Sequence, residues 1–297
     1  MSAAGPCIFH AACPVANAVA TGIMGSFPRL RSGDEMTKLT NKIQFFYGTT
    51  WYWPIPYLPR VMISASFVRA RKSKLKIENP WMMDSGIGGM FKVGTRPRIT
   101  LEEYVKIIDL QNPPIAWTYD YPCEPTIRKR YGYTPTEAQD KTNQNTITLR
   151  ERFGLQNVMS VVQGWSIDDY LSNLDKIKEE GLLTEKLGIG SICRRGQTKE
   201  IVRIIKAVHN NVPNWVKLHG FGVKTSVLNT EARFSLSSVD SSAWGIQGRH
   251  YTWTSNNTKG KTWQDKVPFL TEYVEKMKNT TIGRATLDTY LAEAVKQ

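Results

Sequence analysis

Cysteine, long hydrophobic runs and repetitive sequence are scarce in this chain of 297 residues. The four cysteines are irregularly spaced, at positions 7, 13, 123 and 193, which is atypical of a secreted disulfide framework and indicates a reducing compartment. No stretch approaches the ~20 apolar residues that a membrane-spanning helix needs, so we expect no membrane partner. Low-complexity blocks are also absent, and the composition (41% hydrophobic, 22% charged) is that of a globular protein.

Acidic residues are outnumbered by basic ones. Lys and Arg total 39 against 26 Asp and Glu, which gives a net charge of +13 and a pI near 9.5. Basic side chains also serve solubility alone, but an excess of this size favours a polyanionic partner such as nucleic acid.

The N-terminal segment differs in character from the rest of the chain. It begins with small and apolar residues but lacks the basic and leucine-rich regions of a signal peptide. We predict that residues 1–37 form a poorly ordered or non-native extension, with Met24 and Met36 as alternative starts. We expect residues 38–297 to form a single domain, which is within the usual size range.

Beyond this segment, short apolar runs alternate with amphipathic ones. The apolar runs have the length of strands that are buried on both faces. They are Val61–Phe67, Ile115–Tyr119, Val158–Val162, Leu187–Ser191, Val216–Gly220 and Phe234–Val239.

The amphipathic runs predict helices between these strands. Thr100 with Glu103, and Ser166 with Asp169, have the spacing of capping boxes at helix starts. Thr198 is a candidate cap for a third helix, and about 35 residues at the C-terminal end also have a helical pattern. Repeated strand–helix units predict parallel strands with helical crossovers, either in a (β/α)8 barrel or in an open doubly wound sheet.

Polar residues and glycines follow several of the predicted strands. Both candidate folds bind their ligands at the C-terminal ends of the strands. A single Asp after a strand is more often a helix cap than a catalytic group, but several such residues together indicate a site. One carboxylate could act as a nucleophile, a second could transfer a proton, and a third with an amide could bind the donor edge of a flat heterocycle. The residues are Asp84, Ser85, Asp120, Gln163, Gly190, His219 and Asp240.

Ordered motifs around these residues resemble the tRNA-guanine transglycosylase superfamily. The motifs are Asp84-Ser85-Gly86, Val161-Val162-Gln163-Gly164, Gly188-Ile189-Gly190, Leu218-His219-Gly220-Phe221-Gly222 and Ser238-Val239-Asp240. The segments Lys217–Gly222 and Ser238–Trp244 are most similar to the branch that acts on DNA, the DpdA group. The resemblance covers roughly residues 60 to 250 and implies an α/β fold, a (β/α)8 TIM barrel, over a single catalytic domain of residues 38–297 with a helical C-terminal end.

The resemblance also implies a reaction. Enzymes of this branch exchange guanine in DNA for a 7-deazaguanine, typically 7-cyano-7-deazaguanine or a derivative, through a covalent aspartyl-deoxyribose intermediate. By resemblance, Asp240 is the nucleophile and Asp84 is the proton-transfer carboxylate. The residues implied in binding the base are Asp120, Gln163, Ser85, Gly190, His219 and Phe91.

The sequence departs from the tRNA enzymes in one respect that bears on the substrate. Their zinc site uses cysteines that follow the nucleophile, but no cysteine follows Cys193 here, so we predict no zinc subdomain. Cys7, His10 and Cys13 have metal-like spacing, but three ligands fall short of a structural zinc set, and we predict no metal and no cofactor.

Reaching a base inside a duplex requires the nucleotide to be flipped out of the stack, which contacts to phosphates can offset. Basic residues near the predicted strand ends are candidates for these contacts: Arg128, Lys129, Arg130, Arg194, Arg195 and Arg249. Trp244 is a candidate either for a wedge in the gap left by the base or for the core. A solvated surface is the alternative interpretation of the basic runs.

We therefore predict a DNA-guanine transglycosylase whose partners are DNA and a 7-deazaguanine base. The expected location is the cytoplasm, or the host cytoplasm if a phage encodes the protein. Three alternatives stay open: exchange on tRNA, release of guanine without reinsertion, and a catalytically silent nucleic-acid-binding barrel. The oligomeric state is not predicted by the sequence.

Overall fold

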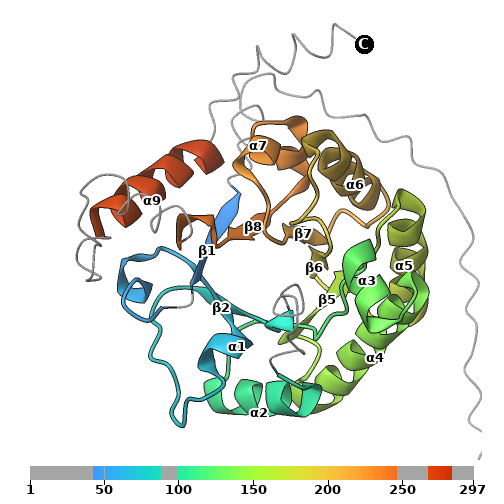
Figure 1. The fold of residues 1–297 in the computed structure, drawn as a ribbon, viewed down its shortest axis with the longest axis horizontal. Coiled ribbons are helices and arrows are strands. Elements are labelled where there is room, and N and C mark those ends of the chain that lie inside the picture. Colours follow the sequence, from blue (N-terminus) through green and yellow to red (C-terminus); the bar gives the residue numbers. More distant parts are fainter. Residues whose placement is uncertain (1–42, 50, 88–98, 246–266, 283–297) are drawn as a thin grey trace, which may run out of the picture. The chain divides into compact units, whose positions relative to one another are not determined.

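Eight parallel strands form a closed barrel in which each strand pairs with the next along the chain and β8 pairs with β1 (Figure 1). This computed structural model describes residues 43–49, 51–87, 99–245 and 267–282. The strands are β1 (Gln44–Thr49), β2 (Val61–Ser64), β3 (Trp81–Asp84), β4 (Ala116–Trp117), β5 (Val158–Val162), β6 (Lys186–Ile189), β7 (Lys217–Gly220) and β8 (Ser238–Ser241). The predicted (β/α)8 TIM barrel is therefore confirmed, and the open sheet is excluded.

Helices lie outside the ring of strands and connect them (Figure 1). They are η2 (Ile55–Tyr57), α1 (Ala65–Val68), α2 (Leu101–Gln111), α3 (Pro125–Tyr131), α4 (Pro135–Phe153), α5 (Ile167–Glu179), α6 (Thr198–Asn210), α7 (Thr225–Leu228), η4 (Glu231–Ser235) and α9 (Val267–Ile282). The barrel lies within the predicted domain of residues 38–297, but the boundary at residue 37 stays a prediction because residues 1–42 are outside the described part. None of the helices described here is long and apolar enough to cross a membrane.

Helix starts follow the predicted capping chemistry. The Thr100 and Ser166 side chains accept hydrogen bonds from the backbone N–H groups of Glu103 and Asp169, and both capping boxes are complete. Thr198 is the first residue of α6 rather than its cap, because Gln197 occupies the N-cap position.

Several predicted strands have different bounds in the structure. The run Val61–Phe67 is a strand only as far as Ser64, and α1 begins at Ala65. Phe234–Val239 begins in the turn η4, and β8 starts at Ser238. The segment Val158–Val162 forms β5 with the predicted bounds.

The barrel interior is filled by large side chains. A buried cluster inside it contains Phe46, Met62, Met82, Trp117, Met159 and Val161. The Trp117 ring lies 4.8 Å from the His219 ring and 5.1 Å from the Phe221 ring, between ring centres. The interior is thus a packed core rather than a channel, as is usual for this fold, and it forms a rigid base below the C-terminal ends of the strands.

We expect the substitution Met82→Ala to lower the free energy of unfolding by about 2–5 kcal/mol, because it leaves a cavity in the barrel interior. Urea unfolding followed by tryptophan fluorescence measures this loss. Leu155→Ala is the control, because Leu155 is 61% exposed and its truncation should change the free energy by less than about 0.5 kcal/mol. Equal losses in both variants would contradict this account of the interior.

Candidate active site

Side-chain alternation places three functional residues above the barrel core. Side chains along a strand point alternately inward and outward, so residues two apart share a direction. Met82 and Val161 belong to the interior cluster. Asp84 lies two residues after Met82, at the end of β3, and Gln163 lies two residues after Val161, directly after β5. Asp240 likewise lies two residues after Ser238 on β8. The Ser238 hydroxyl contacts the interior His219. These side chains therefore converge at the end of the barrel where β3, β5 and β8 finish.

Asp120, which follows β4, is held by two side chains, Ser85 and Gln163, that the resemblance had also assigned to base binding. The Ser85 hydroxyl donates to Asp120 Oδ1 at 3.1 Å, and Gln163 Nε2 donates to Asp120 Oδ2 at 2.5 Å. Both donors are buried, whereas Asp120 is partly exposed. The two hydrogen bonds thus fix the orientation of the carboxylate.

Gln163 is anchored through its backbone as well as its side chain. Its N–H donates to Asn173 Oδ1 at 2.7 Å, and its carbonyl accepts from Gln139 Nε2 at 2.9 Å. A side chain at Gly190 would begin 2.3 Å from Gln163 Nε2. Gly190, which directly follows β6, therefore leaves the space that the Gln163 amide occupies while it binds Asp120.

Asp240 is oriented by the loop after β7 and by the barrel interior. The Gly222 N–H donates to Asp240 Oδ1 at 2.9 Å, and Gly222 has φ = +59°, which favours glycine. His219 Nε2 lies 3.4 Å from the same oxygen, while His219 Nδ1 is 2.9 Å from Ser238 Oγ. His219 is fully buried among Trp117 and Phe221, so it faces Asp240 from the core side.

Burial and neighbouring charges raise the pKa values of two carboxyl groups, Asp84 and Asp120. Burial, with the charges of Asp120 and Asp240, raises the pKa of Asp84 to about 7, although the backbone N–H groups of Gly86 and Ser85 oppose the shift. Burial raises the pKa of Asp120 to about 6, with a contribution from the charge of Glu124, while the bonds from Ser85 and Gln163 act in the opposite direction. Near neutral pH, Asp84 therefore exchanges readily between its acidic and basic forms.

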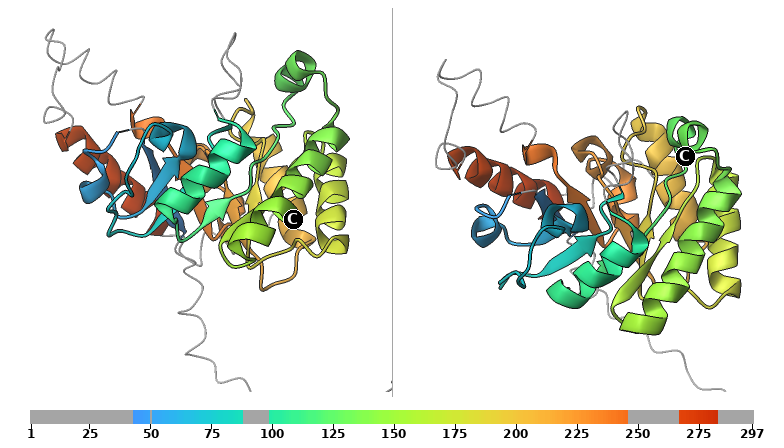
Figure 2. Two further views of the ribbon diagram at one scale, coloured as in Figure 1. Left: turned by 90° about the horizontal axis from the view of Figure 1, so that it is seen from below. Right: turned by 60° about the horizontal axis from the view of Figure 1, so that its bottom comes forward.

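The basic residues expected to contact nucleic acid fall into two groups. Arg128, Lys129 and Arg130 lie on α3, which projects past the neighbouring helices at one end of the barrel (Figure 2). Arg194 is exposed on the loop after β6.

Arg195 does not fit this expectation. Its side chain is fully buried, its guanidinium lies 4.0 Å from the Trp165 ring centre, and it pairs with Glu200. A phosphate cannot reach Arg195 without disrupting this packing, and we leave it out of the proposed contacts.

Other candidates have a different placement or lie outside the described residues. Trp244 is buried and donates its ring N–H to the Gly48 carbonyl at 2.8 Å, so it belongs to the core rather than to a wedge. Phe91, Arg249 and the Cys7, His10 and Cys13 group lie outside the described part of the chain. Among the residues that are described, no group of three or more His, Cys, Asp or Glu could hold a metal ion.

Two residues of this region were not predicted from the sequence. Glu124 is buried next to the Asp120 loop, and its Oε2 is 2.9 Å from Ser191 Oγ, which is also 2.8 Å from Gln163 Oε1. The signals in the sequence were slight: Glu124 follows Asp120 by four residues, and Ser191 directly follows Gly190.

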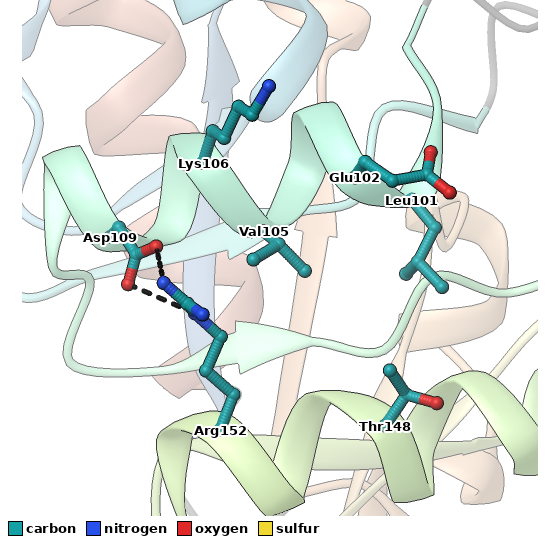
Figure 3. A pocket seen from close by; sticks show the side chains of 7 residues that line it. All are labelled: Leu101, Glu102, Val105, Lys106, Asp109, Thr148 and Arg152. Carbon is teal, nitrogen blue, oxygen red and sulfur yellow. Dashed lines mark hydrogen bonds and ion pairs between the residues drawn. The ribbon is translucent and has the colours of Figure 1, made fainter.

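A separate groove lies on the outside of the barrel, between α2 and α4 (Figure 3). It is lined by Leu101, Glu102, Val105, Lys106, Asp109, Thr148 and Arg152. The Asp109–Arg152 ion pair crosses one end of it (Figure 3). None of the carboxyl groups of the candidate site lines this groove.

The model of the family described as DpdA, DeoxyPurine in DNA protein A, matches residues 49–287. The chain belongs to the DpdA family. The match includes β2 to β8 and every functional residue placed above. No curated protein matches the chain.

Membership of the DpdA family supports a DNA-guanine transglycosylase function in general terms and implies DNA as the substrate. The resemblance to this branch of the tRNA-guanine transglycosylase superfamily, stated from the motifs, is confirmed. The base that is exchanged, the intermediate and the roles of the individual residues are matters of proposal.

We expect Gly190→Ala to lower the transglycosylase activity of this DpdA protein at least about tenfold, because displacing Gln163 costs hydrogen bonds to a charged group. Gly196→Ala is the matched control, since an added Cβ there meets nothing within 4 Å. Activity is compared at equal folded concentration, checked by circular dichroism. Wild-type activity in Gly190→Ala would contradict the role given to Gln163.

Proposed function

We propose that this protein exchanges guanine in DNA for a 7-deazaguanine base, 7-cyano-7-deazaguanine or a derivative, through a covalent bond between Asp240 and the deoxyribose. The observation that carries the proposal is the group of carboxyls at the barrel end. One of them, Asp240, is oriented by a backbone N–H, and another, Asp84, has a pKa near neutrality. This pairing suits a nucleophile and a proton donor in one site.

In the first half of the reaction, an Asp240 carboxylate oxygen attacks C1′ of the flipped nucleotide. The bond between C1′ and N9 breaks, and the departing guanine takes the proton of the Asp84 carboxyl. Asp84 is left as a carboxylate, and the sugar is held as an ester of Asp240. The Gly222 N–H, at 2.9 Å from Asp240 Oδ1, orients the carboxylate for this attack.

In the second half, the incoming 7-deazaguanine gives its N9 proton to the Asp84 carboxylate. Its N9 then attacks C1′, and Asp240 leaves as a carboxylate. Both catalytic residues return to their starting states, so the exchange needs no external proton or energy source.

Base binding is assigned to Asp120 with its two donors, Ser85 and Gln163. An ionised Asp120 accepts from the N1–H and amino groups that guanine and 7-deazaguanines share. This common edge lets one site bind the leaving base and the incoming base in turn. His219, enclosed by aromatic rings and adjacent to Asp240, supports the nucleophile and the lower side of the base site.

DNA binding is assigned to the exposed basic residues of α3, Lys129 and Arg130, together with Arg128 and Arg194. Phosphate contacts from these residues would offset the cost of unstacking the target base, which is a few kcal/mol. The net charge of +13 is consistent with this assignment.

The test uses DNA with radiolabelled guanine, with and without 7-cyano-7-deazaguanine, and labelled tRNA in parallel. We expect loss of label from DNA only when the analogue is present, with the analogue recovered in the digested nucleosides. Asp240→Ala should lower the exchange at least about 10³-fold and abolish a covalent protein–DNA adduct on denaturing gels. Loss of label from tRNA alone, or abasic sites in DNA without reinsertion, would contradict the proposal.

We also expect a pH dependence that reflects Asp84. Formation of the covalent adduct requires the protonated Asp84 carboxyl, whose pKa is about 7. The single-turnover rate should therefore fall as the pH rises above 7. It should also fall below about pH 6, because Asp120, whose pKa burial raises to about 6, must be ionised to bind the base.

Asp84→Asn removes this titration. The rate of adduct formation in this variant should be low and should no longer fall across pH 6 to 8. An unchanged alkaline fall in Asp84→Asn would contradict the role of Asp84 as the proton donor.

A further inference from the structure

A chain of polar groups connects Asp120 to a second buried carboxyl, Glu124. Asp120 Oδ2 accepts from Gln163 Nε2, and Gln163 Oε1 lies 2.8 Å from Ser191 Oγ. Ser191 Oγ lies 2.9 Å from Glu124 Oε2 and also accepts from the Cys123 N–H at 2.8 Å. The chain thus joins the loop after β4 to the segments that follow β5 and β6.

The hydrogens in this chain limit the possible states. The Ser191 hydroxyl has one hydrogen, but two oxygen atoms lie within bonding distance, Gln163 Oε1 and Glu124 Oε2. With Gln163 oriented so that Nε2 faces Asp120, both contacts contain a hydrogen only if Glu124 is protonated. Glu124 then donates to Ser191, and Ser191 donates to Gln163. In that state Ser191 Oγ donates once and accepts twice, so its hydrogen-bonding capacity is filled.

In the alternative state, the proton lies on Asp120 instead of on Glu124. If Glu124 is ionised, Ser191 donates to it, and the Gln163 amide must rotate to direct Nε2 at Ser191. Gln163 Oε1 then faces Asp120 Oδ2 at a separation of 2.5 Å, which requires a proton on Asp120. A protonated Asp120 accepts hydrogen bonds from the base more weakly than the carboxylate does.

Glu124 is placed to retain a proton. It is 3% exposed, and its Oε1 has no hydrogen-bond partner among the residues that the structure describes. A buried carboxylate with one unsatisfied oxygen is costly, whereas a neutral carboxyl is less so. Burial raises the pKa of Glu124, against the opposing effect of its own backbone N–H, the Ser191 bond and the nearby arginines. The titratable and charged groups around it are Asp120, Cys123, Tyr133, Tyr170, Cys193, Arg194 and Arg195.

We propose that Glu124 is a positioning residue for base binding, whose protonated carboxyl holds Ser191 and Gln163 in the orientation that keeps Asp120 an ionised acceptor. The inference rests on the proposed function only in taking guanine as the base that Asp120 binds. Glu124 does not touch the base in this scheme, and it acts through Ser191 and Gln163.

The test compares Glu124→Gln with Glu124→Ala by equilibrium dialysis of radiolabelled guanine against the full chain, from pH 6.5 to 8.5, a range that lies above the pKa of Asp120, which burial raises to about 6. The Gln amide donates to Ser191 at every pH and so mimics the protonated carboxyl. We expect wild-type affinity for guanine to fall as the pH rises, because an ionised Glu124 takes the single Ser191 hydrogen, and Gln163 is then no longer held with its Nε2 toward Asp120. Glu124→Gln should keep the low-pH affinity within about twofold across the range, and Glu124→Ala should bind at least about tenfold more weakly, as expected for a lost hydrogen bond.

Ser191→Ala and Glu185→Gln complete the set of variants. Ser191→Ala breaks the chain, so adding Glu124→Gln to it should leave guanine affinity and its pH dependence unchanged. Glu185→Gln is the control for a Glu-to-Gln change. Glu185 is exposed and pairs with Lys217 where β6 and β7 begin, which is the end of the barrel opposite to the candidate site. It should behave as the wild type does.

Equal guanine affinity in wild type, Glu124→Gln and Glu124→Ala at every pH would overturn the inference, as would equal weakening in Gln and Ala variants that both remain folded. Dialysis requires no turnover, so this result is independent of the exchange assay. Absence of base exchange in the wild type, combined with the expected guanine binding, would contradict the proposed function while supporting the role of Glu124.

Discussion

Repulsion among carboxyl groups is the constraint on which the rest of this site depends. Asp84, Asp120 and Asp240 occupy one end of the barrel, where low solvent exposure strengthens their mutual interaction. The structure meets this constraint with donors rather than with cations. Gly222 supplies a backbone N–H to Asp240, and Ser85 and Gln163 supply side-chain donors to Asp120. In Asp84, burial and the charges of Asp120 and Asp240 outweigh the hydrogen bonds from the Gly86 and Ser85 N–H groups, and the pKa is raised to about 7. The different roles proposed for three identical side chains therefore rest on the different surroundings of each.

Such donors require close approach, and this explains the glycines around the site. At Gly190 a side chain would occupy the space of the Gln163 amide, and at Gly222 the backbone has a positive φ and lies against Cys193. The α/β barrel provides the rest of the precision, because the functional side chains extend from strands whose preceding inward residues are packed in the core. Preorganisation of this kind would orient Asp240, the proposed nucleophile, with little reorganisation during the reaction.

The parts of this structure that were predictable are those encoded by local patterns. The β5 run and the Thr100 and Ser166 capping boxes have strong local signals, and the ordered motifs at the strand ends identified the candidate site. Helix α4 has no apolar stripe, because its buried side carries polar residues such as Thr142, Asn143 and Thr146, and it was not predicted. The link from Glu124 to Ser191 spans 67 residues of sequence. No periodicity encodes such a contact, since it arises only when the barrel closes.

The position of His219 indicates how the core and the chemistry are connected. An imidazole inside an apolar barrel core is costly for stability, since its Nε2 has no hydrogen-bond partner within the described part of the chain. The contacts of the ring connect it to Asp240. Ser238 contacts Nδ1, and Nε2 faces the Asp240 carboxylate at 3.4 Å. Because the Trp117 and Phe221 rings confine the imidazole, its orientation relative to Asp240 is set by core packing. The candidate site and the core of this barrel are thus continuous, so substitutions in the aromatic layer should affect Asp240, the proposed nucleophile, as well as the stability of the fold.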